Sequence, residues 1–229
     1  MPEAPVDSRS EAAGLRRWLA HNAWRLVLLF VGVLLPLAGF VSLADEIHEA
    51  EAFHFDDALL WKMHGLASPA LNSFFVLMSK LGYQWGVIPA DILIVGALLL
   101  MRRWRKAAFA AAAFIGSALL NLGSKQIFQR ERPSLWESVA PESTFSFPSG
   151  HAMGSMTLAL TVVLLLWNTR WRWPALCAAA VFVALVGSAR VYLGVHYPSD
   201  ILGGWCAALV WVLGVYMVMF RRRWSLPAP

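Results

Sequence analysis

Three short clusters of polar residues interrupt a chain that is otherwise strongly apolar, and their residue types suit phosphoryl transfer. Charged side chains inside an apolar, membrane-like sequence are costly and usually functional. The clusters are Lys125 with Arg132-Pro133, then Pro148-Ser149-Gly150-His151, and then Arg190 with His196 and Asp200.

The first chemical feature is a group of three cations, Lys125, Arg132 and Arg190, without a matching cluster of acids in the sequence around them. Such cations repel one another unless an anion binds among them. Arginine offers a planar fork of donors for phosphate oxygens, and lysine supplies a point charge. Ser149 is a good N-cap for the following apolar run, and Gly150 would let the backbone N–H groups approach the same anion. These residues predict a phosphate cradle.

The second feature is a pair of histidines. His196 and Asp200 are four residues apart, and Pro198 between them suits the first turn of a helix. Asp200 could accept a hydrogen bond from one ring nitrogen of His196 and leave the other free to attack phosphorus. His151 could then protonate the leaving oxygen. The acids do not form a set that suggests Mg²⁺, so we expect neither a metal nor a cofactor.

Each of these residues also has an ordinary interpretation when it is taken alone. Lys125, Arg130 and Arg132 could be a basic loop whose side chains reach lipid head groups. His151 could be a helix-end histidine, and His196 with Asp200 could simply cap a helix. Only their joint spacing favours an active site. Two groups of acids are expected to be solvated: Glu131, Glu137 and Glu142 in the loop, and Asp45, Glu46, Glu49, Glu51, Asp56 and Asp57 in an earlier segment. Asp91, inside an apolar run, is an exception that needs a partner, and its role stays open.

The chain that must position these residues has 229 residues, of which 59% are hydrophobic and only 14% charged. A soluble domain carries nearer to a quarter charged residues, so lipid must cover part of the surface. A spanning helix needs about 20 apolar residues. We therefore predict an all-α, polytopic six-transmembrane-helix bundle, with a short extra interfacial helix at 69–80. The six predicted spans are 26–44, 81–101, 107–124, 152–169, 173–189 and 201–220.

The distribution of basic residues predicts the orientation. Arg and Lys residues gather before span one and after spans two, four and six. Because successive spans alternate in direction, all of these positions lie on one side, which should be the cytoplasm. The three polar clusters then share the extracytoplasmic side. This organisation gives a cytoplasmic tail at 1–23, a membrane domain at 24–220 and a second cytoplasmic tail at 221–229. Because the basic residues form short clusters instead of one face, nucleic acid is set aside as a partner.

The first span leaves one alternative open. It ends in Ser42-Leu43-Ala44, which is similar to a signal-peptide cleavage site. Its apolar run is longer than a usual signal sequence, so a retained anchor is favoured.

The three clusters together resemble the signature of the type-2 phosphatidic acid phosphatase superfamily, whose membrane branch has six spans and an extracytoplasmic active site. The resemblance implies a phosphohistidine nucleophile at His196, an orienting carboxylate at Asp200 and a general acid at His151. It also implies phosphoryl binding by Lys125, Arg132, Ser149, Gly150 and Arg190. One departure is Ala189, where the family usually has serine, so a supporting hydrogen bond is in doubt.

The resemblance implies a bacterial inner-membrane lipid phosphatase. Undecaprenyl pyrophosphate is the first expected substrate, followed by phosphatidylglycerophosphate, phosphatidate and lipid A phosphates. A phosphotransferase that passes the phosphoryl group to another lipid remains the main alternative. A vanadate-dependent oxidase, a transporter and a serine protease built on Ser149 and His151 explain the residues less well. The expected partners are the lipid substrate and the bilayer, and the oligomeric state stays open.

Overall fold

The computed structural model describes residues 20, 23, 26–27, 29–49 and 53–220. The predicted tails at 1–23 and 221–229, with their basic residues, therefore lie almost wholly outside the described residues. Every regular element in the described part is a helix, which confirms the all-α prediction.

The helices follow one another with short connections, apart from one long loop between α6 and α7. In chain order they are a π-helical turn η1 (Phe30–Leu34), α2 (Leu35–His48), α3 (His54–His64), α4 (Pro69–Leu81), α5 (Val87–Leu100), α6 (Trp104–Phe128), α7 (Gly150–Leu166), α8 (Arg172–Tyr192) and α9 (Pro198–Met219).

Four helices are long and apolar enough to cross a bilayer: Phe30–His48, α6, α8 and α9. The runs predicted at 81–101 and 152–169 instead form α5 and α7, with 14 and 17 residues. At 1.5 Å per residue they are about 21 and 26 Å long, against a hydrocarbon core of roughly 30 Å. The chain turns at residues 82–86 before α5 begins, which shortens the first of these runs. The count of six spans therefore stays a prediction. The four long apolar helices support the prediction that the chain is a membrane protein.

The first helix accommodates a proline by a local change of helix type. Pro36 has no N–H to donate, and just before it the N–H of Leu35 bonds to the carbonyl of Phe30, five residues back. A π-turn of this kind absorbs the disruption without breaking the helix.

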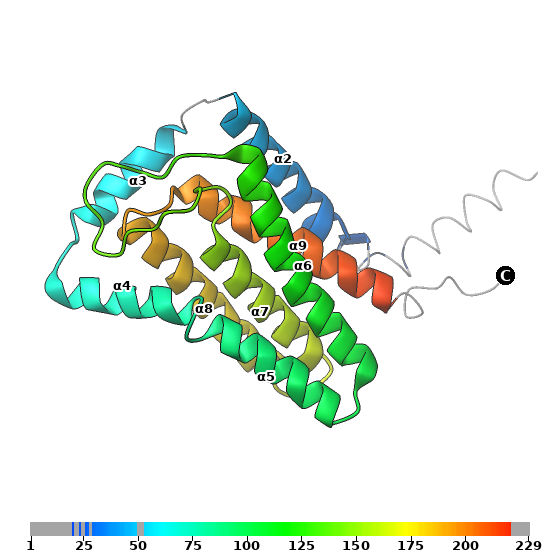
Figure 1. The fold of residues 1–229 in the computed structure, drawn as a ribbon. Coiled ribbons are helices and arrows are strands. Elements are labelled where there is room, and N and C mark those ends of the chain that lie inside the picture. The colour runs from blue at the N-terminus through cyan, green and yellow to red at the C-terminus, as the bar shows by residue number, and fades with distance from the viewer. Residues whose placement is uncertain (1–19, 21–22, 24–25, 28, 50–52, 221–229) are drawn as a thin grey trace, which may run out of the picture.

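Helix α7 lies at the centre of the bundle, packed against α5, α6, α8 and α9 (Figure 1). Its inward side is built from small residues such as Ala152, Ser155 and Ala159, which lets the neighbouring helices approach closely. The outer surface is rich in exposed apolar side chains, among them Leu93 and Ile127, as expected for helices that face lipid. The central position of α7 means that its first residue lies among several helix ends.

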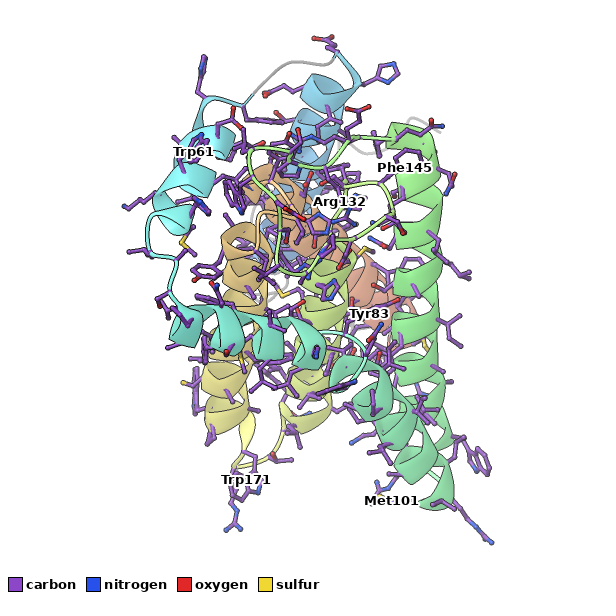
Figure 2. The ribbon with its side chains drawn as sticks, turned by 60° about the vertical axis from the view of Figure 1, so that its left-hand side comes forward. Trp61, Tyr83, Met101, Arg132, Phe145 and Trp171 are labelled. Atoms are coloured by element: carbon purple, nitrogen blue, oxygen red, sulfur yellow. The ribbon has the colours of Figure 1, made fainter. Side chains whose placement is uncertain are left out.

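The two ends of the bundle differ. In Figure 2 Arg132 and Phe145 lie at one end, and Met101 and Trp171 lie at the opposite end. Helices α3 and α4 pack on α8 (Figure 1), and α4 matches the short helix predicted at 69–80. The arrangement brings all three polar clusters to the end where Arg132 lies, while its sidedness in the membrane stays a prediction.

Candidate active site

The turn between α8 and α9 places the predicted nucleophile. Gly194 adopts φ +66°, and a Cβ there would lie 2.6 Å from the ring of Trp136, so only glycine fits. The chain then enters α9 with Pro198 in its first turn, and the carboxylate of Asp200 accepts the N–H of Tyr197 at 2.8 Å. This tight entry fixes His196 two residues before the first residue of α9.

The surroundings of His196 determine which nitrogen is free. Its Nδ1 lies 3.4 Å from Oδ2 of Asp200, and its Nε2 lies 3.1 Å from Nη1 of Arg132. Because arginine can only donate, Nε2 must present its lone pair, and the ring proton must be on Nδ1 facing the carboxylate. Nε2 is therefore the nitrogen able to attack phosphorus.

The imidazole of His196 is 1% exposed. This burial, together with the positive charges of Arg190, Arg132 and Lys125, holds the pKa of His196 well below its usual 6.5. The side chain is therefore neutral at physiological pH, which is the form a nucleophile requires.

Asp200 is completely buried and has two further partners that sequence reasoning missed. Ser146 donates to Oδ2 at 2.5 Å, and Arg130 donates to Oδ1 at 2.6 Å. Arg130 lies two residues before Arg132, but nothing in its sequence context distinguishes it from a loop cation.

The cation cluster contains an acid, which corrects two expectations. Glu142 was expected to be a solvated loop acid, and the three cations were expected to lack a nearby carboxylate. Instead, Oε2 of Glu142 lies 2.8 Å from Nη2 of Arg132, and its Oε1 contacts Nη2 of Arg190. The same Oε1 is 3.9 Å from Nδ1 of His151. Arg132 and Arg190 thus close on one oxyanion beside both histidines.

Arg190 is 1% exposed, and its donors are not all used. Nη1 donates to Oγ of Ser79 at 2.5 Å, and Nε finds no hydrogen-bond partner within the described part of the chain. Ser79, on α4, therefore accepts a hydrogen bond from this arginine. Ala189, at the position where the family usually has serine, has no hydroxyl that could do so. A buried guanidinium N–H without a partner is costly, so the site suits an additional oxygen ligand.

Lys125 and Arg132 also hold the loop that follows α6. Lys125 Nζ donates to Oγ1 of Thr144 at 3.0 Å and contacts the carbonyl of Phe145. Arg132 donates to the carbonyls of Thr144 and Val195, each at 2.5 Å. These bonds fix both cations in place before any ligand binds.

The second cluster forms the start of α7. Ser149 is its N-cap and accepts the N–H of Ala152 at 3.5 Å. A Cβ on Gly150 would lie 3.0 Å from Oδ1 of Asn121, whose amide donates to the carbonyl of Pro148. The ring of His151 packs against Tyr83 at 5.0 Å. The N-terminus of α7, with its positive dipole end, thus opens beside the cations.

A cavity of about 740 Å³ connects these groups. It is lined by five of the predicted residues, Lys125, Gly150, His151, Arg190 and His196. Arg132 and Asp200 contact His196 directly, and the N–H of Ser149 donates to the carbonyl of Asp200 at 3.1 Å. The structure therefore brings all eight predicted site residues together, while their chemical roles remain predictions.

The cavity also reaches exposed apolar surface on α6. Its wall includes Leu122 on α6, which is 61% exposed, and Tyr83, which is labelled in Figure 2. An apolar, exposed wall beside a cationic interior suits a molecule with a charged head and an apolar tail.

Comparison with known proteins agrees with this geometry. The sequence model of one family, the PAP2 superfamily, matches residues 106–224, a range that contains all eight site residues. The chain belongs to the PAP2 superfamily. It is 32% identical over 188 residues to the undecaprenyl-diphosphatase of Sulfolobus acidocaldarius, a match that covers 80% of this chain and 84% of that protein.

Two further comparisons match this PAP2 protein to proteins of Bacillus subtilis, one by sequence and one by structure. Phosphatidylglycerophosphatase B is 29% identical over 176 residues, covering 75% of this chain and 86% of the relative. The crystal structure of a transmembrane PAP2-type phosphatidylglycerolphosphate phosphatase superposes with a TM-score of 0.71 at 27% identity, covering 83% of this chain and 97% of that one. The predictions of the family and of a phosphatase are confirmed.

Proposed function

We propose that this protein hydrolyses a membrane lipid phosphate or diphosphate at the extracytoplasmic face, through a phosphohistidine on His196. Undecaprenyl diphosphate is the first expected substrate, and phosphatidylglycerophosphate the second. The observation that carries the proposal is the oxyanion clamp: Arg132 and Arg190 hold one carboxylate next to His151, and Arg132 also contacts His196.

In the first chemical step, Nε2 of His196 forms a bond to phosphorus and the bond from phosphorus to the lipid oxygen breaks. The leaving oxygen keeps the electron pair and takes a proton from His151. Asp200 holds the ring proton on Nδ1 and balances the positive charge that develops on the imidazole. Lys125, Arg132 and Arg190 stabilise the charge on the equatorial oxygens.

In the second step, a water oxygen attacks phosphorus and gives its proton to His151. The phosphorus–nitrogen bond breaks, its electron pair returns to Nε2, and inorganic phosphate leaves. This sequence restores both histidines to their starting protonation states.

Two observations support a lipid substrate over a soluble phosphomonoester. The cavity wall includes the exposed Leu122, next to Leu119, which is 62% exposed on the same helix. Both named relatives act, by their names, on lipid phosphates or diphosphates. The relative with the higher identity is an undecaprenyl-diphosphatase, which is why that lipid comes first.

The test is phosphate release by purified protein in detergent with EDTA. The panel contains undecaprenyl diphosphate, phosphatidylglycerophosphate, phosphatidate and a soluble phosphomonoester. The His196→Ala variant should release no phosphate, and His48→Ala, which changes an exposed histidine, should match the wild type. Release that persists in His196→Ala would refute the phosphohistidine route. Transfer to a second lipid without free phosphate would instead establish the phosphotransferase.

Sidedness is tested separately with a membrane-impermeant thiol reagent on intact cells. Cys177 and Cys206 are first changed to alanine, and single cysteines are placed at Ser143, in the cavity wall, and at Trp171, at the opposite end of the bundle. Labelling of the Ser143 site alone supports an extracytoplasmic active site, and labelling of the Trp171 site alone contradicts it.

A further inference from the structure

We propose that Arg130 and Asp56 are positioning residues for the reaction, forming a buried chain of charges from α3 to Asp200 that fixes the orientation of His196. The inference rests on the proposed function, because it concerns the carboxylate that orients the nucleophile. Neither the family signature between Lys125 and Asp200 nor the resemblance assigns a role to either residue.

Arg130 joins two buried carboxylates. Its Nη1 lies 2.6 Å from Oδ1 of Asp200, and its Nη2 lies 2.9 Å from Oδ2 of Asp56. Asp56 is 3% exposed and Asp200 is 0% exposed. The guanidinium of Arg130 also lies 4.2 Å from the ring centroid of Tyr197, the residue after His196. Two carboxylates buried this deeply need a shared cation, and the arginine fork supplies one donor to each.

The position of Asp56 corrects the expectation that it belongs to a solvated acidic segment. Its Oδ1 accepts the N–H of Ser199 at 2.9 Å, and its Oδ2 accepts the hydroxyl of Ser199 at 2.5 Å. The N–H of Ser199 belongs to the first turn of α9 and has no partner within that helix. Asp56 therefore caps, from α3, the helix that carries Asp200.

The two carboxylate oxygens of Asp200 have different partners, and this gives the buried chain of charges a chemical role beyond packing. Oδ1 is held by Arg130, whereas Oδ2 faces Nδ1 of His196 and accepts the hydroxyl of Ser146. Rotation of the carboxylate would break the bond from Arg130 to Oδ1 together with the bonds that Oδ2 accepts from Ser146 and the N–H of Tyr197, so Arg130 is the charged group among the three that fix which oxygen His196 meets. A histidine whose carboxylate partner is lost or turned can adopt the wrong tautomer, which removes the free lone pair on Nε2.

The charges around His196 determine how its protonation should respond. Asp200 on α9 favours the protonated ring. Arg190 on α8, Arg132 in the loop and Lys125 on α6 oppose it. A proton on His151 of α7 would oppose it too, but burial and the neighbouring cations lower the pKa of His151 to about 2. Arg130 offsets the charge of Asp200, and Asp56 offsets that of Arg130. Loss of the cation and loss of the outer carboxylate should thus shift the protonation of His196 in different directions.

The experiment measures kcat, KM and the acid limb of the kcat/KM pH profile with the lipid that the wild-type protein hydrolyses fastest. Arg130→Gln should lower kcat about 10–100-fold with KM within about threefold, and should move the acid limb to higher pH. Asp56→Asn should also lower kcat but should not move the acid limb upward. Ser199→Ala, which keeps every charge, should lose less activity and keep the wild-type profile.

Matched controls separate this role from general stability. Asp57→Asn makes the same change at the next, exposed residue of α3, and Arg170→Lys changes an exposed arginine. Both should behave as wild type. If Arg130→Gln does not fold, as judged by size-exclusion chromatography and thermal denaturation, Arg130→Lys carries the test: it keeps the charge but loses the fork between Asp56 and Asp200, so kcat should fall while the acid limb stays in place. Folded variants of Arg130 and Asp56 whose kcat and acid limb match those of Asp57→Asn would overturn the proposal.

A second measurement separates this inference from the proposed function. Orthovanadate imitates the transferring phosphoryl group and binds through Nε2 of a correctly oriented histidine. If the wild-type protein releases no phosphate from any lipid, the proposed function fails, and binding of vanadate to the wild type and to Arg130→Gln decides the positioning role. Weaker binding to folded Arg130→Gln than to Asp57→Asn supports the role, and equal binding, or none to any of them, overturns it.

Discussion

Glu142 occupies the position where two arginines can hold an oxyanion, so substrate and Glu142 should compete for the same donors. The change Glu142→Gln removes the negative charge and keeps the size of the side chain. We expect it to tighten the binding of inorganic phosphate, because Arg132 and Arg190 would no longer be balanced by an anion of the chain itself.

The size of the effect follows from the exposure of the three groups. The side chains of Arg190, Arg132 and Glu142 are 1%, 12% and 29% exposed. Exposed pairs contribute about 0.2–1 kcal/mol, and this site is more buried on its arginine side. We take about 1 kcal/mol after discounting for solvent screening, which corresponds to a roughly fivefold lower inhibition constant for phosphate.

The assay is competitive inhibition of lipid hydrolysis by inorganic phosphate at low and high salt. The matched control is Glu137→Gln, an exposed acid of the same loop that has no ion pair with the described residues. The effect of Glu142→Gln should shrink at high salt, because added ions screen the arginines. An unchanged or higher inhibition constant in Glu142→Gln, or an equal decrease in Glu137→Gln, would refute the competition.

Three further predictions test other parts of the site. Arg190→Lys keeps the positive charge but removes the guanidinium fork. That fork donates to Ser79 and carries an Nε–H without a partner among the described residues, so kcat should fall about 10²–10³-fold in a steady-state assay. Because the pKa of His196 lies well below 6.5, the neutral form persists on acidification, and the acid limb of kcat/KM should lie below pH 6.5; a limb at or above 6.5 would contradict the effect of burial. EDTA should leave phosphate release unchanged, and a loss that added Mg²⁺ or Zn²⁺ restores would disprove a reaction that needs no metal.

The helices of this protein could be predicted largely from its apolar runs. The runs at 107–124, 173–189 and 201–220 correspond to α6, α8 and α9, because their length and lack of charge leave few alternatives. The run at 81–101 overestimated α5, since the apolar residues Leu81 and Tyr83 belong to the end of α4 and to the turn that follows it. Hydropathy does not distinguish such a turn from a helix.

The site could be predicted only where residue type and spacing both indicate chemistry. His151, His196 and Asp200 satisfied that condition. Asp56 did not, because it lies 144 residues before Asp200 within an acidic segment, and only the packing of α3 against α9 brings the two together. Glu142 was missed for a related reason: the loop that carries it is folded by bonds to Lys125 and Arg132, and these bonds are not visible in local sequence.

The hydrogen bond that the Ser79 hydroxyl accepts from Arg190 has an evolutionary consequence. In this chain the group that supports the arginine comes from α4, while the position before the arginine, Ala189, is fully buried without one. We therefore expect that a hydroxyl from either of the two helices can support this arginine. Relatives with alanine before this arginine should tend to carry serine or threonine at the position of Ser79, and relatives with serine there should vary more freely on α4. A family alignment would reveal this as covariation between two positions 110 residues apart in the chain.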